Sequence, residues 1–372
     1  MDYGLTDQAT TLRREVRAFV EDELAPVAAE IDREDRYPAA VLAALGDHGY
    51  TGLTVDTDYG GGGGSLLELT VLVEELSRAN MAVASAVGLN LGVAEAIERF
   101  GTDEQRESYL PGMARFETVG ALGLSEAGAG SDKSGMETTA RRDGDEWVVD
   151  GRKRWVTNFA NADIVLTYAK TGGEWPRGVT AFLLPAEDLA VETAWETMGA
   201  RGVETAAVSI DRVRVPETAV VGGVGDGMVQ RGELRTGVNV PARAVGLAQA
   251  AFEDAREFAG ERRQFGGPLT DKQGLRWRLA EMAERTDTSR LLVRRAASLA
   301  DAGEETTRAT SMAKIHATEA AVANANDAMQ VHGGAGYVTD TDVGRYLRDA
   351  RLLTVAGGPN EVHRDSLADA LL

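Results

Sequence analysis

A glycine-rich turn near the C-terminus leads directly into a polar segment, in the stretch LLTVAGGPNEVHR at residues 352–364. Small residues let backbone N–H groups approach a bound molecule, and an acidic side chain beside them can accept a proton from carbon. Residues 356–358 read Ala-Gly-Gly, with no carboxylate among them. If the protein removes a proton from carbon, its base must lie elsewhere.

The common catalytic motifs give no alternative. The sequence contains no G-x-S-x-G, H-E-x-x-H or strand-linked G-x-G-x-x-G pattern and no cysteine. It has four histidines, at His48, His316, His332 and His363. Their wide separation favours isolated structural histidines over a metal site. We therefore expect no metal, and we expect catalysis to rely on a bound organic cofactor.

The charge balance is strongly acidic. There are 59 acidic and 39 basic residues, which give a formal net charge of −20, and only five of the basic residues are lysine. Such a surface repels nucleic acid and anionic lipid, so neither is an expected partner. Scarce lysine together with abundant Asp and Glu favours adaptation to a salt-rich cytoplasm, a halophilic character, over an ordinary acidic enzyme. Without an apolar signal region or a membrane-span window, the expected location is cytoplasmic.

The elements that must position a site follow from hydrophobic periodicity. Residues 5 to about 115 carry apolar residues at three- and four-residue spacing, which predicts helices, with DYGGGGGS (58–65) as a flexible connector. Short β-branched and aromatic runs over about 117–218 predict an antiparallel barrel or sandwich. The helical period returns from about 226 and persists almost to the end. This order predicts one compact α–β–α unit.

Four segments, in this order and spacing, carry a resemblance to a known family. They are LGLSEAGAGSD (122–132), WVTN (155–158), ERRQFGGPLTDKQ (261–273) and DAMQVHGGAGY (327–337). Together with GGPNEVHR they make the whole chain resemble the acyl-CoA dehydrogenase flavoproteins. The resemblance implies an α+β fold, with an N-terminal helical domain (1–116), a central β-barrel or sandwich domain (117–225) and a C-terminal four-helix bundle (226–372). It also implies a homotetramer built as a dimer of dimers.

The resemblance assigns FAD as the cofactor, held partly by a neighbouring subunit. Leu124 and Ser125 would face the pyrimidine edge, Trp155 would pack on the isoalloxazine, and the Thr157 hydroxyl would reach flavin N5. The remaining positions assigned to the pyrophosphate and adenosine side, or to the flavin turn, are Ser131, Arg262, Phe265, Gln273, Gln330, Gly333, Gly334 and Asn360.

The implied activity is α,β-dehydrogenation of an acyl-CoA thioester in fatty acid metabolism. A base removes the α-proton, the β-hydrogen leaves as hydride to flavin N5, and hydrogen bonds to the thioester carbonyl stabilise the enolate. Electrons would pass to electron-transfer flavoprotein. Neither the acyl chain length nor the physiological direction is readable from the sequence.

The family base is absent from both of its usual positions. One position corresponds to Gly357, and the other, in the first helix of the C-terminal domain, corresponds to Thr236, followed by Gly237. Pro241 lies four residues after Gly237 and predicts a kink or a late helix start around 236–241. Glu233, one helical turn before Thr236, is our candidate base.

Two other interpretations remain open. The first is a catalytically silent protein that binds FAD or an acyl-CoA. The second is a related reaction on the same scaffold, such as enoyl-CoA reduction or oxidase chemistry.

Overall fold

The N-terminal third is helical, as its apolar periodicity predicts, in the computed structural model, which describes residues 4–372. Its elements are α1 (Asp7–Phe19), the π-helical turn η1 (Val20–Leu24), α2 (Ala25–Glu34), α3 (Ala39–Asp47), η2 (Tyr50–Gly52), η3 (Thr57–Tyr59), α4 (Leu66–Ala79), α5 (Met81–Phe100) and α6 (Asp103–Ala114). Side chains fix where the central pair begins: Ser65 and Glu68 form a capping box on α4, and Asn80 caps α5.

Helix α5 is the core of this part. It is the one helix among the described residues that is long and apolar enough to cross a membrane, but 78% of its most apolar window is buried inside the protein. Its burial explains its composition, because a helix surrounded by other helices is apolar on every side.

The glycine run between α3 and α4 is not the flexible connector that the sequence suggested. The N–H of Gly62 donates to Gly52 O at 2.9 Å and the N–H of Gly64 donates to Leu53 O at 2.7 Å. A Cβ atom on Gly61 would come within 2.1 Å of the backbone oxygen of Val55. The glycines are therefore explained by close backbone packing against residues 52–56.

The middle third forms one mainly antiparallel sheet, as predicted. Its spatial order is β6-β7-β3-β2-β4-β5-β8, with β1 parallel to β4. The strands are β1 (Gly120–Gly123), β2 (Thr139–Asp143), β3 (Glu146–Thr157), β4 (Ile164–Lys170), β5 (Val179–Pro185), β6 (Ala190–Ala194), β7 (Thr205–Pro216) and β8 (Val220–Val221). The adjoining runs EWVVDG and RKRWVT form one long strand β3, with a register shift near Gly151.

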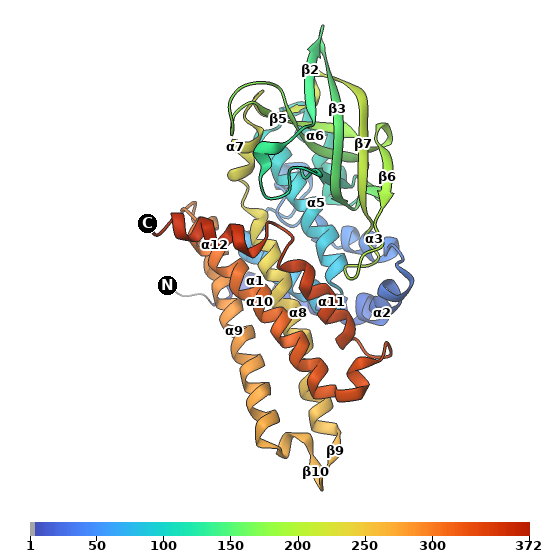
Figure 1. Cartoon of the computed structure of the whole chain (residues 1–372), viewed down its shortest axis with the longest axis vertical. Helices are drawn as coiled ribbons and strands as arrows, with labels where there is room; N and C mark the ends of the chain where they lie inside the picture. Colours follow the sequence, from blue (N-terminus) through green and yellow to red (C-terminus); the bar gives the residue numbers. More distant parts are fainter. Residues whose placement is uncertain (1–3) are drawn as a thin grey trace.

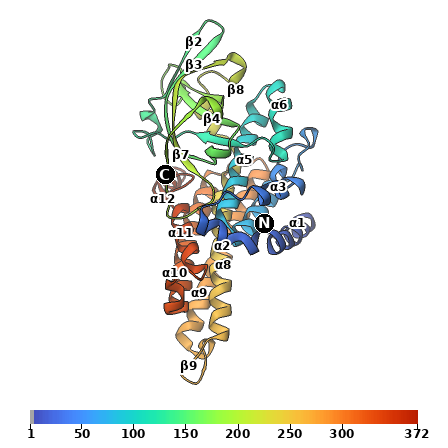
Figure 2. The same ribbon diagram turned by 90° about the vertical axis from the view of Figure 1, so that its right-hand side faces the viewer.

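The C-terminal part is a bundle of long helices with a small hairpin at its tip. Its elements are α7 (Gly227–Gly232), η8 (Thr236–Val238), α8 (Asn239–Glu261), β9 (Arg263–Gln264), β10 (Gly267–Pro268), η9 (Leu269–Asp271), α9 (Gln273–Asp301), α10 (Thr307–His332), η10 (Gly333–Tyr337), α11 (Val343–Leu353) and α12 (Asn360–Asp369). The sheet lies at one end of the molecule and the β9–β10 hairpin at the opposite end, with the N-terminal helices beside the half of the bundle nearest the sheet (Figures 1 and 2).

The late helix start predicted around Pro241 is confirmed. Helix α7 ends at Gly232, η8 covers 236–238, and α8 begins only at Asn239. Pro241 is thus the third residue of α8, in the first turn, where a missing N–H costs no intrahelical hydrogen bond.

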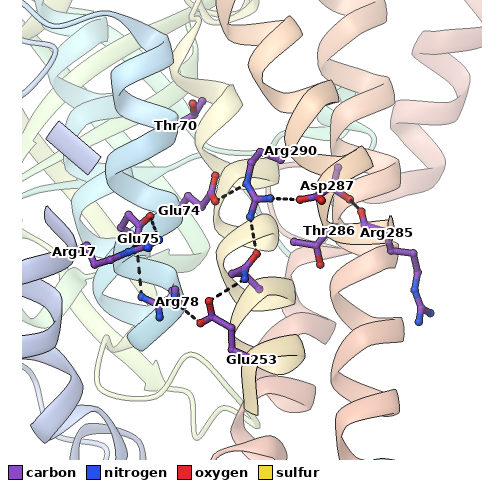
Figure 3. Close-up of polar contacts among 12 residues, drawn as sticks. Arg17, Thr70, Glu74, Glu75, Arg78, Glu253, Arg285, Thr286, Asp287 and Arg290 are labelled. Atoms are coloured by element: carbon purple, nitrogen blue, oxygen red, sulfur yellow. Dashed lines mark hydrogen bonds and ion pairs between the residues drawn. The ribbon is translucent and has the colours of Figure 1, made fainter. Parts of the chain in front are cut away.

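A chain of charged and amide side chains fixes α8 against its neighbours (Figure 3). Arg290 on α9 donates to Glu74 on α4 at 2.8 Å and to Gln249 on α8 at 2.8 Å. Arg78 on α4 donates to Glu253 on α8 at 2.6 Å. These partly buried pairs hold α8 in register with α4 and α9, which sets the position of its N-terminal end.

Candidate active site

The two positions that usually carry the base lie close together, at the start of α8. A Cβ atom on Gly357 would be 2.9 Å from Val240 Cγ2, and Val240 lies one turn beyond Thr236. Gly357 has a φ of 69°, a left-handed conformation that favours glycine. The C-terminal turn thus packs against the first turn of α8, and neither position 236 nor position 357 carries a carboxylate.

In the glycine turn at residues 356–358, side chains bind two of the backbone carbonyls. Lys314 Nζ donates to Gly358 O at 2.7 Å, and His363 Nε2 lies 3.1 Å from Gly357 O. The amide N–H groups of Gly357 and Gly358 donate to no group within residues 4–372. Burial lowers the pKa of Lys314 to about 8. The turn is therefore held rigidly with two free donors, an arrangement that suits an oxyanion or a carbonyl oxygen.

A carboxylate does reach Thr236, but it comes from α5. Glu95 Oε2 accepts the Thr236 hydroxyl at 2.8 Å and the Thr236 N–H at 2.9 Å, and Oε1 accepts the Arg235 N–H at 2.8 Å. Its side chain is 12% exposed. Sequence reasoning missed Glu95 because it lies about 140 residues from Thr236, although an acid within the apolar run GVAEAI was a visible signal.

Glu233, the candidate base from the sequence, shares an arginine with this carboxylate, since Arg99 Nη1 lies 3.4 Å from Glu95 Oε1. The assumption that it shares a helical face with Thr236 is wrong, because α7 ends at Gly232 and residues 233–235 form a link. The Glu233 side chain is 53% exposed and its Oε2 lies 3.7 Å from Arg99 Nη2. A catalytic role for Glu233 stays a prediction.

The aromatic surface expected for the flavin lies at the ends of β1 and β3. Trp155 has 54% of its surface exposed, and its ring centroid lies 5.0 Å from that of Trp195. Trp195 Nε1 and both polar atoms of the Asn158 side chain are buried without a hydrogen-bond partner in the part of the chain that the structure describes. An exposed tryptophan next to buried unpaired donors and acceptors fits a flat aromatic group with polar edges.

The other predicted residues of this surface have internal partners. Ser125 Oγ accepts from Lys133 Nζ at 2.9 Å, and Thr157 Oγ1 lies 3.1 Å from Thr205 Oγ1. Leu124 is buried and Ser131 is exposed. Cofactor contacts at Leu124 therefore have to come from its backbone rather than from its side chain.

A buried ion pair holds this loop against the sheet. Lys153 on β3 is fully buried, and its Nζ donates to Glu126 Oε1 at 2.6 Å. Glu126 also accepts the N–H groups of Glu137 and Thr138. Burial lowers the pKa of Lys153 to about 8, against the opposing effect of Glu126. The pair fixes residues 124–138 onto the strand that carries Trp155.

The remaining predicted cofactor residues are distant from Trp155 within one chain. Arg262, Phe265 and Gln273 lie at the β9–β10 tip, and Phe265 is 93% exposed with a φ of 52° (Figure 1). Gln330, Gly333 and Gly334 are exposed at the end of α10.

Asn360 is a separate case. It is buried at the start of α12, where it binds Lys314 and Thr318. Its side-chain polar atoms therefore serve the packing of α12 on α10.

A further charged residue, Arg243, was not predicted from the sequence. Arg243 on α8 is 9% exposed, and its Nε is buried without a partner. The signal was present, since it is a lone charge within the apolar stretch VPARAVGLA. No group of three or more His, Asp or Glu able to hold a metal occurs among residues 4–372.

Three family models match the chain in succession. They are the acyl-CoA dehydrogenase N-terminal domain over 6–117, the middle domain over 121–213 and the C-terminal domain over 235–372. An acryloyl-CoA reductase (NADH) of Anaerotignum propionicum is 35% identical, over 99% of this chain and 95% of its own.

Solved structures agree with this match over the full length. The butyryl-CoA dehydrogenase of Megasphaera elsdenii superimposes with a TM-score of 0.96 at 32% identity, covering all of both chains. A chain from a structure of the electron transferring flavoprotein of Acidaminococcus fermentans gives a TM-score of 0.97 at 32% identity, also over all of both chains. The three successive matches and these structures show that this chain belongs to the acyl-CoA dehydrogenase family, FAD flavoproteins that oxidise CH–CH bonds.

Proposed function

We propose that the protein catalyses α,β-dehydrogenation of an acyl-CoA thioester and passes the electrons to electron-transfer flavoprotein. The observation that carries this proposal is the contact between Glu95 and Thr236, beside the free N–H groups of the glycine turn. Glu95 and Thr236 would accept the α-proton, and the glycine turn, which packs on Val240 in the first turn of α8, would bind the carbonyl oxygen.

FAD would be held by Trp155 and the Ser125 loop of one subunit and by the Arg262–Phe265 tip of another. When bound, it supplies the acceptor for the β-hydrogen and its electron pair. These two sets of residues lie far apart within one subunit, one on the sheet and the other at the β9–β10 tip. This separation supports an assembly in which each copy completes the FAD site of another. A homotetramer made of two dimers, as the resemblance implies, meets that requirement.

The amide groups of Gly357 and Gly358 would hold the thioester oxygen. Two N–H donors aimed at the same oxygen stabilise the negative charge that develops there when the α-proton leaves. Lys314 and His363 contact the carbonyl oxygens of the turn and hold it in place. The turn therefore does not have to rearrange during the reaction.

Glu95 would be the final acceptor of the α-proton. The proton passes from the α-carbon to the Thr236 oxygen while the hydroxyl proton of Thr236 moves to Glu95 Oε2, across the 2.8 Å hydrogen bond. The C–H bonding electrons remain with the substrate and form the new C=C bond as the β-hydrogen leaves. Glu233 is the second candidate, acting after a movement of the 233–235 link.

A catalytically impaired homologue is the alternative that a specific observation favours. Neither Thr236 nor Gly357 supplies a carboxylate, and the Glu95 carboxylate is already engaged by the Arg235 and Thr236 N–H groups. The same relay also operates in reverse, as enoyl-CoA reduction, and one relative is named for that reaction.

Anaerobic titration of the FAD-loaded protein with a panel of acyl-CoAs tests the proposal. We expect the oxidised flavin absorbance to bleach with at least one ester, and reoxidation on addition of electron-transfer flavoprotein. Spectral shifts without bleaching for every ester would instead establish the impaired homologue.

A further inference from the structure

The ring of His363, on α12, contacts the glycine turn. Its Nε2 lies 3.1 Å from Gly357 O, and its Nδ1 lies 3.5 Å from Ser311 Oγ on α10. A carbonyl oxygen can only accept a hydrogen bond, so Nε2 must carry the proton and donate it. In the neutral ring, Nδ1 then accepts from the Ser311 hydroxyl. The two contacts therefore fix one tautomer, with its donor directed at the turn.

The glycine at position 358 allows the ring to come this close. A Cβ atom on Gly358 would lie 3.3 Å from His363 Nε2, and the residue has a φ of 93°, a left-handed conformation that favours glycine. Burial lowers the pKa of His363, and the Lys314 ammonium adds to this effect, although the contact with Gly357 O opposes it. The ring is therefore neutral at pH 7 and keeps a single donor, the one that faces the turn.

The carbonyl that His363 binds belongs to the same amide as a free donor. Gly357 C=O and Gly358 N–H are the two polar groups of one planar peptide unit, so a hydrogen bond to the oxygen makes the N–H a stronger donor. The Gly358 N–H donates to no group in the part of the chain that the structure describes.

Lys314 binds the same turn in a different way. It donates to Gly358 O, and the amide that contains this oxygen ends at Pro359, which has no N–H. Lys314 therefore holds the turn without polarising a free donor. Among the side chains that bind the carbonyls of this turn, His363 is the one that acts on an amide with an available N–H.

We propose that His363 is a positioning residue that strengthens the Gly358 N–H as a donor to the thioester oxygen. The inference rests on the proposed function, which places that oxygen at the turn. Negative charge grows on the oxygen as the α-proton leaves, and a polarised N–H stabilises it more than it stabilises the neutral ester. The proton on Nε2 stays on the ring throughout.

Ionisation of bound acetoacetyl-CoA tests the donor without any oxidation of the ester. This ester loses a proton to give an enolate whose negative charge is shared by the thioester oxygen, and the enolate is followed by its ultraviolet difference absorbance. In the FAD-loaded protein, we expect the bound ester to ionise at a lower pH than the free ester. His363→Phe keeps a ring but has no donor, so enolate stabilisation should fall by about five-fold, seen as a rise in the pH of half-ionisation.

Matched variants separate polarisation from a structural role. The side-chain amide of glutamine also donates from an Nε2 atom, so His363→Gln should stay within about two-fold of the unsubstituted protein. Arg364→Gln changes the next residue of α12 and leaves the carbonyl contact in place, so it should also stay within about two-fold. Melting midpoints and the affinity for the un-ionised ester establish that each variant keeps its site, and His363→Leu replaces His363→Phe if the latter does not fold.

Two results would overturn the inference. One is a folded variant without a donor at position 363 that ionises the ester like the unsubstituted protein. The other is an equal loss in His363→Phe and His363→Gln, which would show that the ring only fills space. Failure of the unsubstituted protein to bind acetoacetyl-CoA would instead contradict the proposed function and, with it, this inference.

Discussion

The carboxylate of Glu95 accepts a hydrogen bond from the hydroxyl of Thr236 at 2.8 Å, at a position where the family resemblance predicts a glutamate. Under the proposed function, the base would be supplied by α5, one hydroxyl group away from position 236. Glu95→Gln should lower the rate of flavin bleaching by about 100-fold or more, as loss of a general base does. Stopped-flow bleaching measures it.

Glu233 provides the matched comparison. Its carboxylate is half exposed and pairs only loosely with Arg99, so Glu233→Gln should change the bleaching rate by less than about three-fold. The opposite ranking of the two variants would transfer the role of base from Glu95 to Glu233.

Returning a carboxylate to position 236 should improve catalysis if its new neighbour is neutral. Thr236→Glu alone places two carboxylates side by side, which hinders ionisation of one of them. The double variant Thr236→Glu with Glu95→Gln removes that repulsion and should bleach about ten-fold faster than the unsubstituted chain. No gain in the folded double variant would show that the helix position is not aligned with the substrate.

The Lys153–Glu126 pair should control FAD retention. Lys153→Met leaves a buried carboxylate without its cation, which costs about 3 kcal/mol and loosens the loop beside Trp155. The purified variant should contain less FAD per chain, measured by absorbance after gel filtration. Arg152→Met, on the exposed side of the same strand, is the control and should retain FAD normally.

Asp349 should impose a pH dependence on stability. Burial raises the pKa of Asp349 to about 6, although the Ala200 N–H opposes the shift. Between roughly pH 4 and 6 the folded chain binds more protons than the unfolded chain. Stability therefore falls as pH rises through this window, by about 3 kcal/mol, and is constant for this group above it.

Asp349→Asn isolates that effect. The amide keeps an acceptor for Ala200 and carries no charge, so the difference in melting midpoint between pH 4.5 and 7 should shrink in the variant. Arg345, Arg348 and Asp32 act on the same carboxylate and remain in place. Parallel pH profiles for the two proteins would rule out Asp349 as the source.

Salt should stabilise the protein beyond ordinary screening. With a net charge of −20, most repulsion between surface carboxylates is screened by about 0.15 M salt. Adaptation to a salt-rich cytoplasm predicts a melting midpoint that continues to rise from 0.5 to 3 M KCl. A midpoint that is level above 0.5 M KCl would favour an ordinary acidic enzyme.

Local patterns could be predicted from the sequence, and contacts between distant segments could not. The late start of α8 followed from Pro241, because the steric effect of proline acts within one helical turn. The sheet followed from β-branched runs, although the chain merges two predicted runs into β3. Glu95 was invisible as a catalytic candidate, because only the packing of α5 on η8 brings it to Thr236.

The predicted cofactor residues show the same difference between local patterns and distant contacts. Trp155 was identified from its motif and proves to be exposed beside unpaired polar atoms. Asn360 was also identified from its motif, but its side chain is hydrogen-bonded to the buried Lys314 and Thr318. Motif position alone does not determine which partner a side chain takes.

The conformation of Gly357 restricts how such a protein can change over evolutionary time. At a φ of 69°, any other L-residue incurs a strain of about 1–2 kcal/mol, and its first side-chain carbon would press on Val240. A mutation that restores glutamate there needs a second change nearby before it is tolerated, whereas Thr236 begins a right-handed turn with no such barrier. A carboxylate is therefore more readily introduced just before α8 than in the C-terminal turn.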